Sequence, residues 1–226
     1  MTTAKHRLDI DGVLCISLQE RSDRRALIQQ EFAGFDHEIE FVKVRRDEQN
    51  PVRGCYLSHQ RCAALALERG WQRVLILEDD ATFLPPTPRQ IQRLNRFLRV
   101  RRPEICYLGG MLGRMWRIPW PGVVRARLKG TQAYILSSRG CRRLLGHEWY
   151  GKAIDGHYCR HFRAYATYPM ISMQQPESAA SSDIMAYRLE RRAATRCKDE
   201  DYWATNYARQ ASNLRKHWAR TLLMRF

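Results

Sequence analysis

The stretch Leu75–Ala81 constrains the fold most, because an apolar run typical of a buried strand ends there in three consecutive carboxylates. Glu78, Asp79 and Asp80 repel one another, and burial makes that repulsion more costly, so such an ending favours a nearby cation, helix N-terminus or substrate. Side chains alternate along a strand, which predicts Glu78 and Asp80 on one side and Asp79 on the other. Two carboxylates on one side suit Mg²⁺ or Mn²⁺. The alternative is an acidic turn that caps the next segment.

Strands and helices alternate along the first half of the chain. Apolar periodicity and turn residues predict a strand over 12–18, a helix over 23–32, a strand over 39–44, a helix over 60–69, the acidic strand, a helix over 90–100 and a strand over 105–110. This alternation predicts an α/β fold with a parallel or mixed sheet, helices on both faces and a ligand at the carboxyl ends of the strands. The absence of a G-x-G-x-x-G or Walker motif disfavours dinucleotide oxidoreductases and P-loop enzymes.

The second half is less regular. The stretch 111–129 is rich in Trp, Pro and Arg without a clear period, and we interpret it as an ordered loop over a site. It is followed by a predicted strand over 133–136, a helix that reaches residue 145 and an edge strand over 165–169. The stretch 202–223 then spaces apolar side chains at helical intervals: Trp203, Tyr207, Leu214, Trp218 and Leu222. We expect one domain over residues 1–185 and a basic helical extension over residues 186–226, packed on or beside it.

Composition limits the partners and the compartment. The formal net charge of +16 favours polyanions such as nucleic acid, anionic lipid, a phosphorylated glycan or a nucleotide, although arginine spread over solvated faces explains part of the excess. No apolar run is long enough to span a bilayer, and the first residues lack the apolar core of a signal peptide. Seven cysteines without C-x-x-C spacing are typical of reduced thiols. These features favour the cytoplasm, with peripheral contact to the inner membrane face through the basic C-terminal helix as a further expectation.

Four segments in register resemble the family 25 glycosyltransferases, which include bacterial lipooligosaccharide galactosyltransferases and collagen galactosyltransferases. The segments are Ile16–Leu18 with Arg21, Arg24 and Arg25; Gly54–His59; Leu75–Asp80; and Gly130–Ser137 with Gly140, Leu144 and Leu145. The resemblance covers about residues 13–185. The chain departs from the family at Val52-Arg53, where an acid and an apolar residue are usual, and at Gln132, where His is common. These departures concern acceptor and donor specificity rather than the fold.

The resemblance implies a GT-A-like, Rossmann-type mixed sheet flanked by helices, a UDP-sugar donor, a divalent cation and inversion at the anomeric carbon. It implies a cation, Mn²⁺ or Mg²⁺, held by Asp80 with Glu78 beside it, which would neutralise charge on the leaving UDP. It also implies donor contacts from Leu18, Arg21, Arg24, Ser58, His59, Glu78, Asp79, Gly130 and Thr131. Asp79 is a candidate to bind the ribose.

Two donor contacts also have a reason in the local sequence. Arg21 and Arg24, three residues apart at the start of a predicted helix, can lie on one face and contact uracil or phosphate. Ser58 and His59 are predicted to begin a helix whose backbone N–H groups bind an anionic or sugar group.

An inverting transfer needs a general base that takes the proton of the acceptor hydroxyl, and a carboxylate is the usual choice. Asp155, which follows the apolar pair Ala153-Ile154, is our candidate for this base. It could equally cap the following helix, and Asp183 is then the alternative base.

Three functions fit these observations. The first is a transferase that moves galactose or glucose to a cell-surface glycan such as lipooligosaccharide, with the basic C-terminal helix on anionic lipid. The second keeps the donor but glycosylates a hydroxymethylated DNA base, as a phage-type transferase would. The third is a non-catalytic nucleic-acid-binding protein. The intact Glu78-Asp79-Asp80 argues against a degenerate transferase, and no known nucleic-acid-binding motif supports a dedicated binding module.

Overall fold

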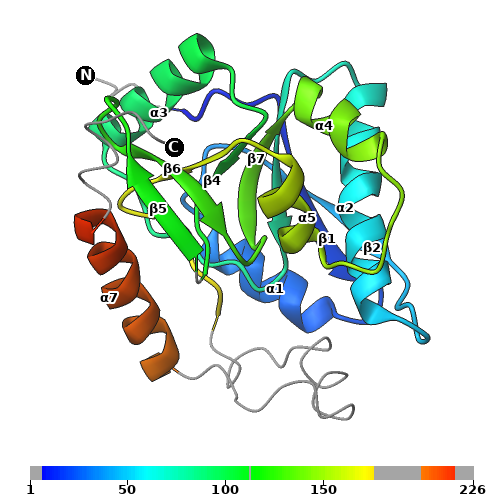
Figure 1. Cartoon of the computed structure of the whole chain (residues 1–226). Coiled ribbons are helices and arrows are strands. Elements are labelled where there is room, and N and C mark those ends of the chain that lie inside the picture. The colour runs from blue at the N-terminus through cyan, green and yellow to red at the C-terminus, as the bar shows by residue number, and fades with distance from the viewer. Residues whose placement is uncertain (1–6, 112, 176–199, 217–226) are drawn as a thin grey trace.

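The computed structural model describes residues 7–111, 113–175 and 200–216, and within these it forms one eight-stranded sheet in the order β2-β1-β3-β7-β4-β8-β6-β5 (Figure 1). The strands are β1 Gly12–Leu18, β2 Ile39–Val44, β3 Arg73–Glu78, β4 Ile105–Tyr107, β5 Gly113–Arg117, β6 Val123–Leu128, β7 Ala133–Ser137 and β8 Ala164–Thr167. β1 is parallel to β2 and β3, whereas β7 is antiparallel to both β3 and β4. β4 is parallel to β8, so the sheet is mixed, and the acidic residues lie at the carboxyl end of β3 within the parallel group β2-β1-β3.

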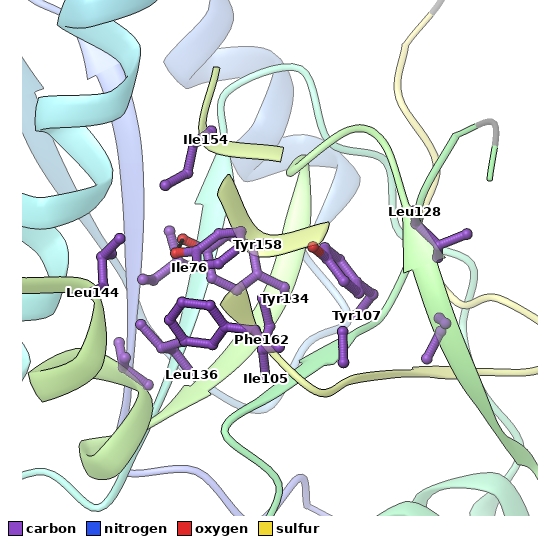
Figure 2. Packing of buried hydrophobic residues seen from close by; sticks show 14 of the residues in the cluster. Ile76, Ile105, Tyr107, Leu128, Tyr134, Leu136, Leu144, Ile154, Tyr158 and Phe162 are labelled. Carbon is purple, nitrogen blue, oxygen red and sulfur yellow. Dashed lines mark hydrogen bonds between the residues drawn. The ribbon is translucent and has the colours of Figure 1, made fainter. Parts of the chain in front are cut away.

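Helices cover both faces of the sheet. They are α1 Ser22–Glu31, α2 Pro51–Glu68, α3 Pro88–Arg101, α4 Ser138–Leu145, α5 Ile154–His161 and α7 Glu200–Lys216. One buried apolar cluster joins α2, α4 and α5 to the sheet, and a second cluster joins α1 and α3 to the other face. Figure 2 shows part of the first cluster, where Tyr134 of β7 meets Tyr158 and Phe162. The predicted α/β class, with a mixed sheet flanked by helices, is confirmed.

Two predictions about the second half are wrong. The stretch 111–129 is not a loop, because β5 and β6 pair within it as an antiparallel hairpin. In β6, Val124, Ala126 and Leu128 are buried and alternate with Arg125, which is half-buried, and Arg127, which is exposed, as expected for a strand with one packed face. The strand near residue 165 is not at an edge, because β8 lies between β4 and β6 and this hairpin covers its outer side.

The helix α7 lies beside β5 at one edge of the sheet (Figure 1). The Gln210 side chain donates to the carbonyl oxygens of Gly110, at 2.9 Å, and Met111, at 3.3 Å, and Asn213 donates to the carbonyl oxygen of Gly113 at 3.1 Å. Leu214 is buried against the sheet. These contacts tie α7 to the segment that enters the hairpin. Of the other residues of the predicted apolar stripe, Trp203 and Tyr207 have side chains that are not described, and Trp218 and Leu222 lie outside the described residues.

No helix in the described part of the chain is both long enough and apolar enough to cross a membrane.

Three histidines pack together where α5 meets the segment after α4. The ring centroids of His147, His157 and His161 lie 4.6 to 4.9 Å apart. His157 is fully buried, and neither of its ring nitrogens has a hydrogen-bond partner among the described residues. Burial, helped by the neighbouring His161 and His147, lowers the pKa of His157 to about 4. His157 is therefore neutral in the folded chain at pH values where an unfolded histidine is charged.

This cluster predicts that the fold loses stability in mild acid. Between pH 6.5 and 4 the unfolded chain binds a proton at residue 157 that the folded chain does not, so the free energy of unfolding falls as pH falls through that window. His157→Phe should keep the ring packing and remove about 2 kcal/mol of that pH dependence. Denaturant unfolding at pH 7 and pH 4.5 measures it, and equal pH dependence in the two proteins would contradict the assignment.

Candidate functional site

A cleft of about 210 Å³ opens at the carboxyl ends of β1, β2 and β3, next to the segment that leads into β7. It is lined by ten of the residues that sequence reasoning singled out: Leu18, Arg24, Ser58, His59, Glu78, Asp79, Asp80, Gly130, Thr131 and Asp155. Arg21 is not among the lining residues, because its guanidinium turns toward Asp23, with Nη2 2.8 Å from Oδ2. Asp183 lies outside the described residues.

The three consecutive carboxylates have different surroundings, and Asp79 is the one held by an arginine. Arg24 Nη1 of α1 donates to Asp79 Oδ1 at 2.9 Å, and both side chains are nine-tenths buried or more. Burial raises the pKa of Asp79, and the guanidinium of Arg24 offsets part of that rise. Loss of one partner from such a buried pair leaves an uncompensated charge. The pair therefore ties α1 to the end of β3.

Glu78 is fixed from two sides. Thr131 Oγ1 donates to Glu78 Oε1 at 2.5 Å, and His59 Nε2 lies 3.5 Å from the same oxygen. The imidazole is itself held from behind, because His59 Nδ1 lies 2.8 Å from the Tyr134 hydroxyl, which is 2.9 Å from the Tyr158 hydroxyl. Figure 2 shows the two tyrosines. This buried row of side chains gives the Glu78 carboxylate a defined position in the wall of the cleft.

Asp80 has one oxygen that none of the described residues contacts by a hydrogen bond. Gln174 Nε2 donates to Asp80 Oδ2 at 2.5 Å, whereas Oδ1 is buried and has no hydrogen-bond partner in the described part of the chain. Burial, followed by the charge of Glu78, raises the pKa of Asp80 to about 7. A buried, unpartnered carboxylate oxygen beside a second carboxylate is suited to a cation. The donor set of hard oxygens fits Mg²⁺ or Mn²⁺ rather than a soft metal.

No cluster of three or more His, Cys, Asp or Glu side chains is arranged to hold a metal among the described residues. A structural zinc site needs such a cluster, but Mg²⁺ is usually bound by one or two carboxylates together with substrate phosphates. Asp80 and Glu78 match this second arrangement, in which the substrate completes the coordination.

The predicted start of a helix at Ser58 is wrong. α2 begins at Pro51, and the side chain of Asn50 accepts a hydrogen bond from the Arg53 backbone N–H as its N-cap. Ser58 and His59 are therefore in the middle of the helix, where Ser58 Oγ donates to the Gly54 carbonyl at 2.7 Å. Their backbone N–H groups belong to the helix and are not available to an anion. Only their side chains face the cleft.

The candidate base lies in the first turn of α5. Ala153, not Asp155, is the N-cap residue, so the capping role that we left open for Asp155 is wrong. Asp155 Oδ2 accepts the Gly130 N–H at 3.4 Å across the cleft wall. Gly130 has a φ of +81°, and a Cβ there would lie 2.7 Å from Gln132 Oε1. A residue without a side chain is required at this point for the wall to close around Asp155.

Gln132 is a cleft residue that sequence reasoning did not select. It is 2% exposed, and among the described residues neither its amide oxygen nor its amide nitrogen has a hydrogen-bond partner. A buried amide without partners destabilises the ligand-free protein. A ligand that supplies hydrogen-bond partners to the amide removes this cost and thereby binds more tightly. Gln174, which contacts Asp80, and Arg45 at the cleft rim were also missed. Of these three residues, only Gln132 was marked in the sequence, because it stands where His is common in the family 25 glycosyltransferases.

We expect Gln132→Leu to separate stability from binding. An apolar side chain of similar volume removes the unpartnered amide, so the ligand-free protein should gain about 1 kcal/mol of unfolding free energy. Affinity for a polar ligand of the cleft should fall about tenfold, because leucine can neither donate nor accept a hydrogen bond. Thermal unfolding and calorimetry measure the two effects. A variant that is less stable, with unchanged affinity, would show that Gln132 is a packing residue.

No family model matches the chain, and no curated protein matches it. Among solved structures the chain is similar to A197 from STIV, at a TM-score of 0.47 and 12% identity over 73% of this chain and 94% of that chain. It is also similar to a glycosyltransferase involved in the glycosylation of the major capsid of PBCV-1, at a TM-score of 0.35 and 11% identity over 59% of this chain and 64% of that chain. A third similarity is to an apo UDP-glucose pyrophosphorylase, at a TM-score of 0.43 and 12% identity over 79% and 82% of the two chains. At TM-scores below 0.5 these similarities assign neither a function nor membership in family 25, and any assignment depends on the side chains of the cleft.

Proposed function

We propose that the chain is a glycosyltransferase that moves a sugar, galactose or glucose, from a UDP-sugar to a hydroxyl acceptor, with inversion at the anomeric carbon and a requirement for Mn²⁺ or Mg²⁺. The observation that carries the proposal is the difference between two neighbouring carboxylates. Asp79 is bound to Arg24, whereas Asp80 keeps a buried oxygen that has no partner among the described residues. A cleft with one such oxygen beside Glu78, at the carboxyl ends of parallel strands, suits a diphosphate with its cation.

Asp80 and Glu78 would hold the cation, which would supply positive charge beside the diphosphate as the glycosidic bond breaks. Thr131 and His59 keep the Glu78 carboxylate oriented toward that position. Arg45 at the cleft rim offers a guanidinium, whose geometry suits phosphate oxygens.

Asp155 is the proposed general base. Its carboxylate lines the same cleft as Asp80, and the Gly130 N–H holds it without neutralising it. In an inverting transfer it would accept the proton of the acceptor hydroxyl as that oxygen attacks the anomeric carbon from the face opposite the leaving UDP.

The proposed acceptor is an anionic, lipid-linked cell-surface glycan such as lipooligosaccharide. The net charge of +16 supports an anionic partner. Arg209, Arg215 and Lys216 are exposed on α7, the described part of the basic C-terminal extension. Contact of this extension with anionic lipid belongs to the same proposal.

A donor screen that measures release of UDP tests the function. UDP-galactose or UDP-glucose should release UDP in the presence of Mn²⁺ and much more slowly in EDTA. Lipid-linked glycan and hydroxymethylated DNA are then compared as acceptors, and faster release with DNA would move the acceptor to nucleic acid. If no UDP-sugar is turned over in a metal-dependent way, the proposal fails.

A further inference from the structure

A second group of functional side chains lies at the end of the sheet opposite the cleft. β3 begins at Arg73, β4 and β8 begin at Ile105 and Ala164, and the antiparallel β7 ends here at Ser137. The cleft lies where β3 ends, one strand length away, roughly 17 Å. We call this end the basic edge, defined by six residues: Arg73, Arg101, Arg102, Glu104, Arg139 and Arg163. No motif of the sequence analysis includes it.

Two adjoining cavities hollow the basic edge. One, of about 510 Å³, is lined by Arg73, Arg102 and Arg139 together with polar groups of the β7–α4 junction. The other, of about 160 Å³, is lined by Arg101, Arg139 and Arg163 with Glu104. Arg139 lines both cavities. Among the described residues, five guanidinium groups thus surround a concave surface that contains one carboxylate.

The internal ion pairs of the basic edge leave most of its positive charge uncompensated. Arg73 pairs with Asp9 at 2.9 Å, and Arg139 lies 3.5 Å from Glu104, which also accepts from a neighbouring arginine of α4. Arg101, Arg102 and Arg163 have no carboxylate within 4.0 Å in the part of the chain that the structure describes. Three charged groups therefore face the cavities without an acidic partner from the described protein.

Like charges are also held close together beside these cavities. Arg125 of β6 is partly buried, and burial, followed by the charge of Arg163, lowers its pKa. Tyr165 of β8 opposes part of this effect, and Arg127 adds to it. The guanidinium groups of Arg125 and Arg163 repel each other, and a bound anion would relieve this repulsion.

We propose that the basic edge is a second ligand site, which binds the phosphate groups of a diphosphate or of two neighbouring phosphomonoesters. Guanidinium groups bind phosphate oxygens through paired, charge-assisted hydrogen bonds, and several of them match a group with two negative charges better than they match a single carboxylate. Two cavities that share Arg139 fit two linked phosphates. The N-terminus of α4 at the same rim adds a favourable dipole. The site does not depend on the function proposed for the cleft.

Calorimetry with inorganic pyrophosphate, in buffer free of phosphate, tests the site on the full chain. Arg139→Gln should weaken binding about tenfold or more, because Arg139 faces both cavities. Arg93→Gln is the matched control: it removes the same charge from an exposed position on α3 outside both cavities, and it should change affinity by less than about twofold. Equal losses in the two variants would reduce the effect to net charge and overturn the proposal, as would unchanged binding in Arg139→Gln.

Glu104→Gln supplies a test with the opposite sign. This change removes the carboxylate that competes with phosphate for Arg139, so pyrophosphate should bind more tightly. Weaker binding would contradict the site.

Vesicles of phosphatidylcholine, with and without phosphatidic acid, distinguish a lipid source of the phosphate from a soluble one. If the wild-type chain sediments with the acidic vesicles, Arg139→Gln does not, and neither protein binds pyrophosphate, the site is assigned to lipid head groups. Binding of neither probe would overturn it.

Discussion

Asp80→Asn should lower turnover by about 10²-fold or more and at the same time make the ligand-free protein more stable. Burial, followed by repulsion from Glu78, raises the pKa of Asp80 to about 7, and both effects cost the fold stability whenever the carboxylate is charged. A carboxyl whose pKa is higher in the folded state loses stability as pH rises from its unfolded value of 3.8 toward 7, so the gain from asparagine should be full at pH 8 and small near pH 4. We expect a gain of about 1 to 3 kcal/mol at pH 8, or roughly 3 to 10 °C in thermal midpoint.

Asp47→Asn is the matched control for this experiment. Asp47 also lines the cleft, but Arg53 Nε donates to its Oδ2 at 2.6 Å and lowers its pKa. Its loss should therefore reduce stability slightly and leave metal-dependent UDP binding intact. If Asp80→Asn is less stable than the parent protein at pH 8 and still binds UDP in a metal-dependent way, Asp80 is a structural residue.

Asp155→Asn should lower turnover by about 10² to 10⁴, the range for a positioned proton acceptor, while the affinity for UDP changes by less than about twofold. The amide keeps the shape of the side chain and can still accept the Gly130 N–H, so the wall of the cleft should persist. Steady-state kinetics with a saturating donor measures the first effect, and calorimetry with UDP measures the second.

Stability provides the check on this assignment. Asp155 is in the first turn of α5 and its loss removes a favourable interaction with the helix dipole, worth about 0.5 kcal/mol. Unchanged turnover per folded molecule, with only such a loss of stability, would remove Asp155 as the base. Asp183→Asn would then be the variant to measure.

The two strands beside the acidic strand could be predicted from sequence with accurate bounds, whereas the acidic strand itself ends at Glu78 and leaves Asp79 and Asp80 in the turn that follows. β1 and β2 match the predicted ranges 12–18 and 39–44, since each is a continuous or alternating apolar run between turn residues. The hairpin of β5 and β6 was missed because its tryptophans and prolines obscured a period of two. Arg125 and Arg127, alternating with apolar residues in β6, contained that signal.

The start of α2 was missed for a different reason. Pro51 was interpreted as a loop residue, although Asn50-Pro51 is an N-cap followed by proline at the first helical position. The prediction for Ser58 and His59 failed as a consequence.

Contacts between distant parts of the chain could not be predicted. The sequence grouped Glu78 with Asp80 and placed Asp79 apart, but nothing in it indicated which carboxylate would meet an arginine. The pairing of Asp79 with Arg24, and of Asp80 with Gln174, depends on how α1 and the segment after β8 pack against the end of β3. Such contacts join residues 55 and 94 positions apart, which no local period describes.

Calorimetric titration of UDP into the wild-type chain, once with Mn²⁺ and once with EDTA, measures whether the cleft binds the diphosphate through a cation. The buried oxygen of Asp80 beside Glu78, which has no partner in the described part of the chain, predicts binding in Mn²⁺ that weakens at least about tenfold in EDTA, because the carboxylates then repel the diphosphate. Equal affinity for UDP with and without the metal would contradict the account.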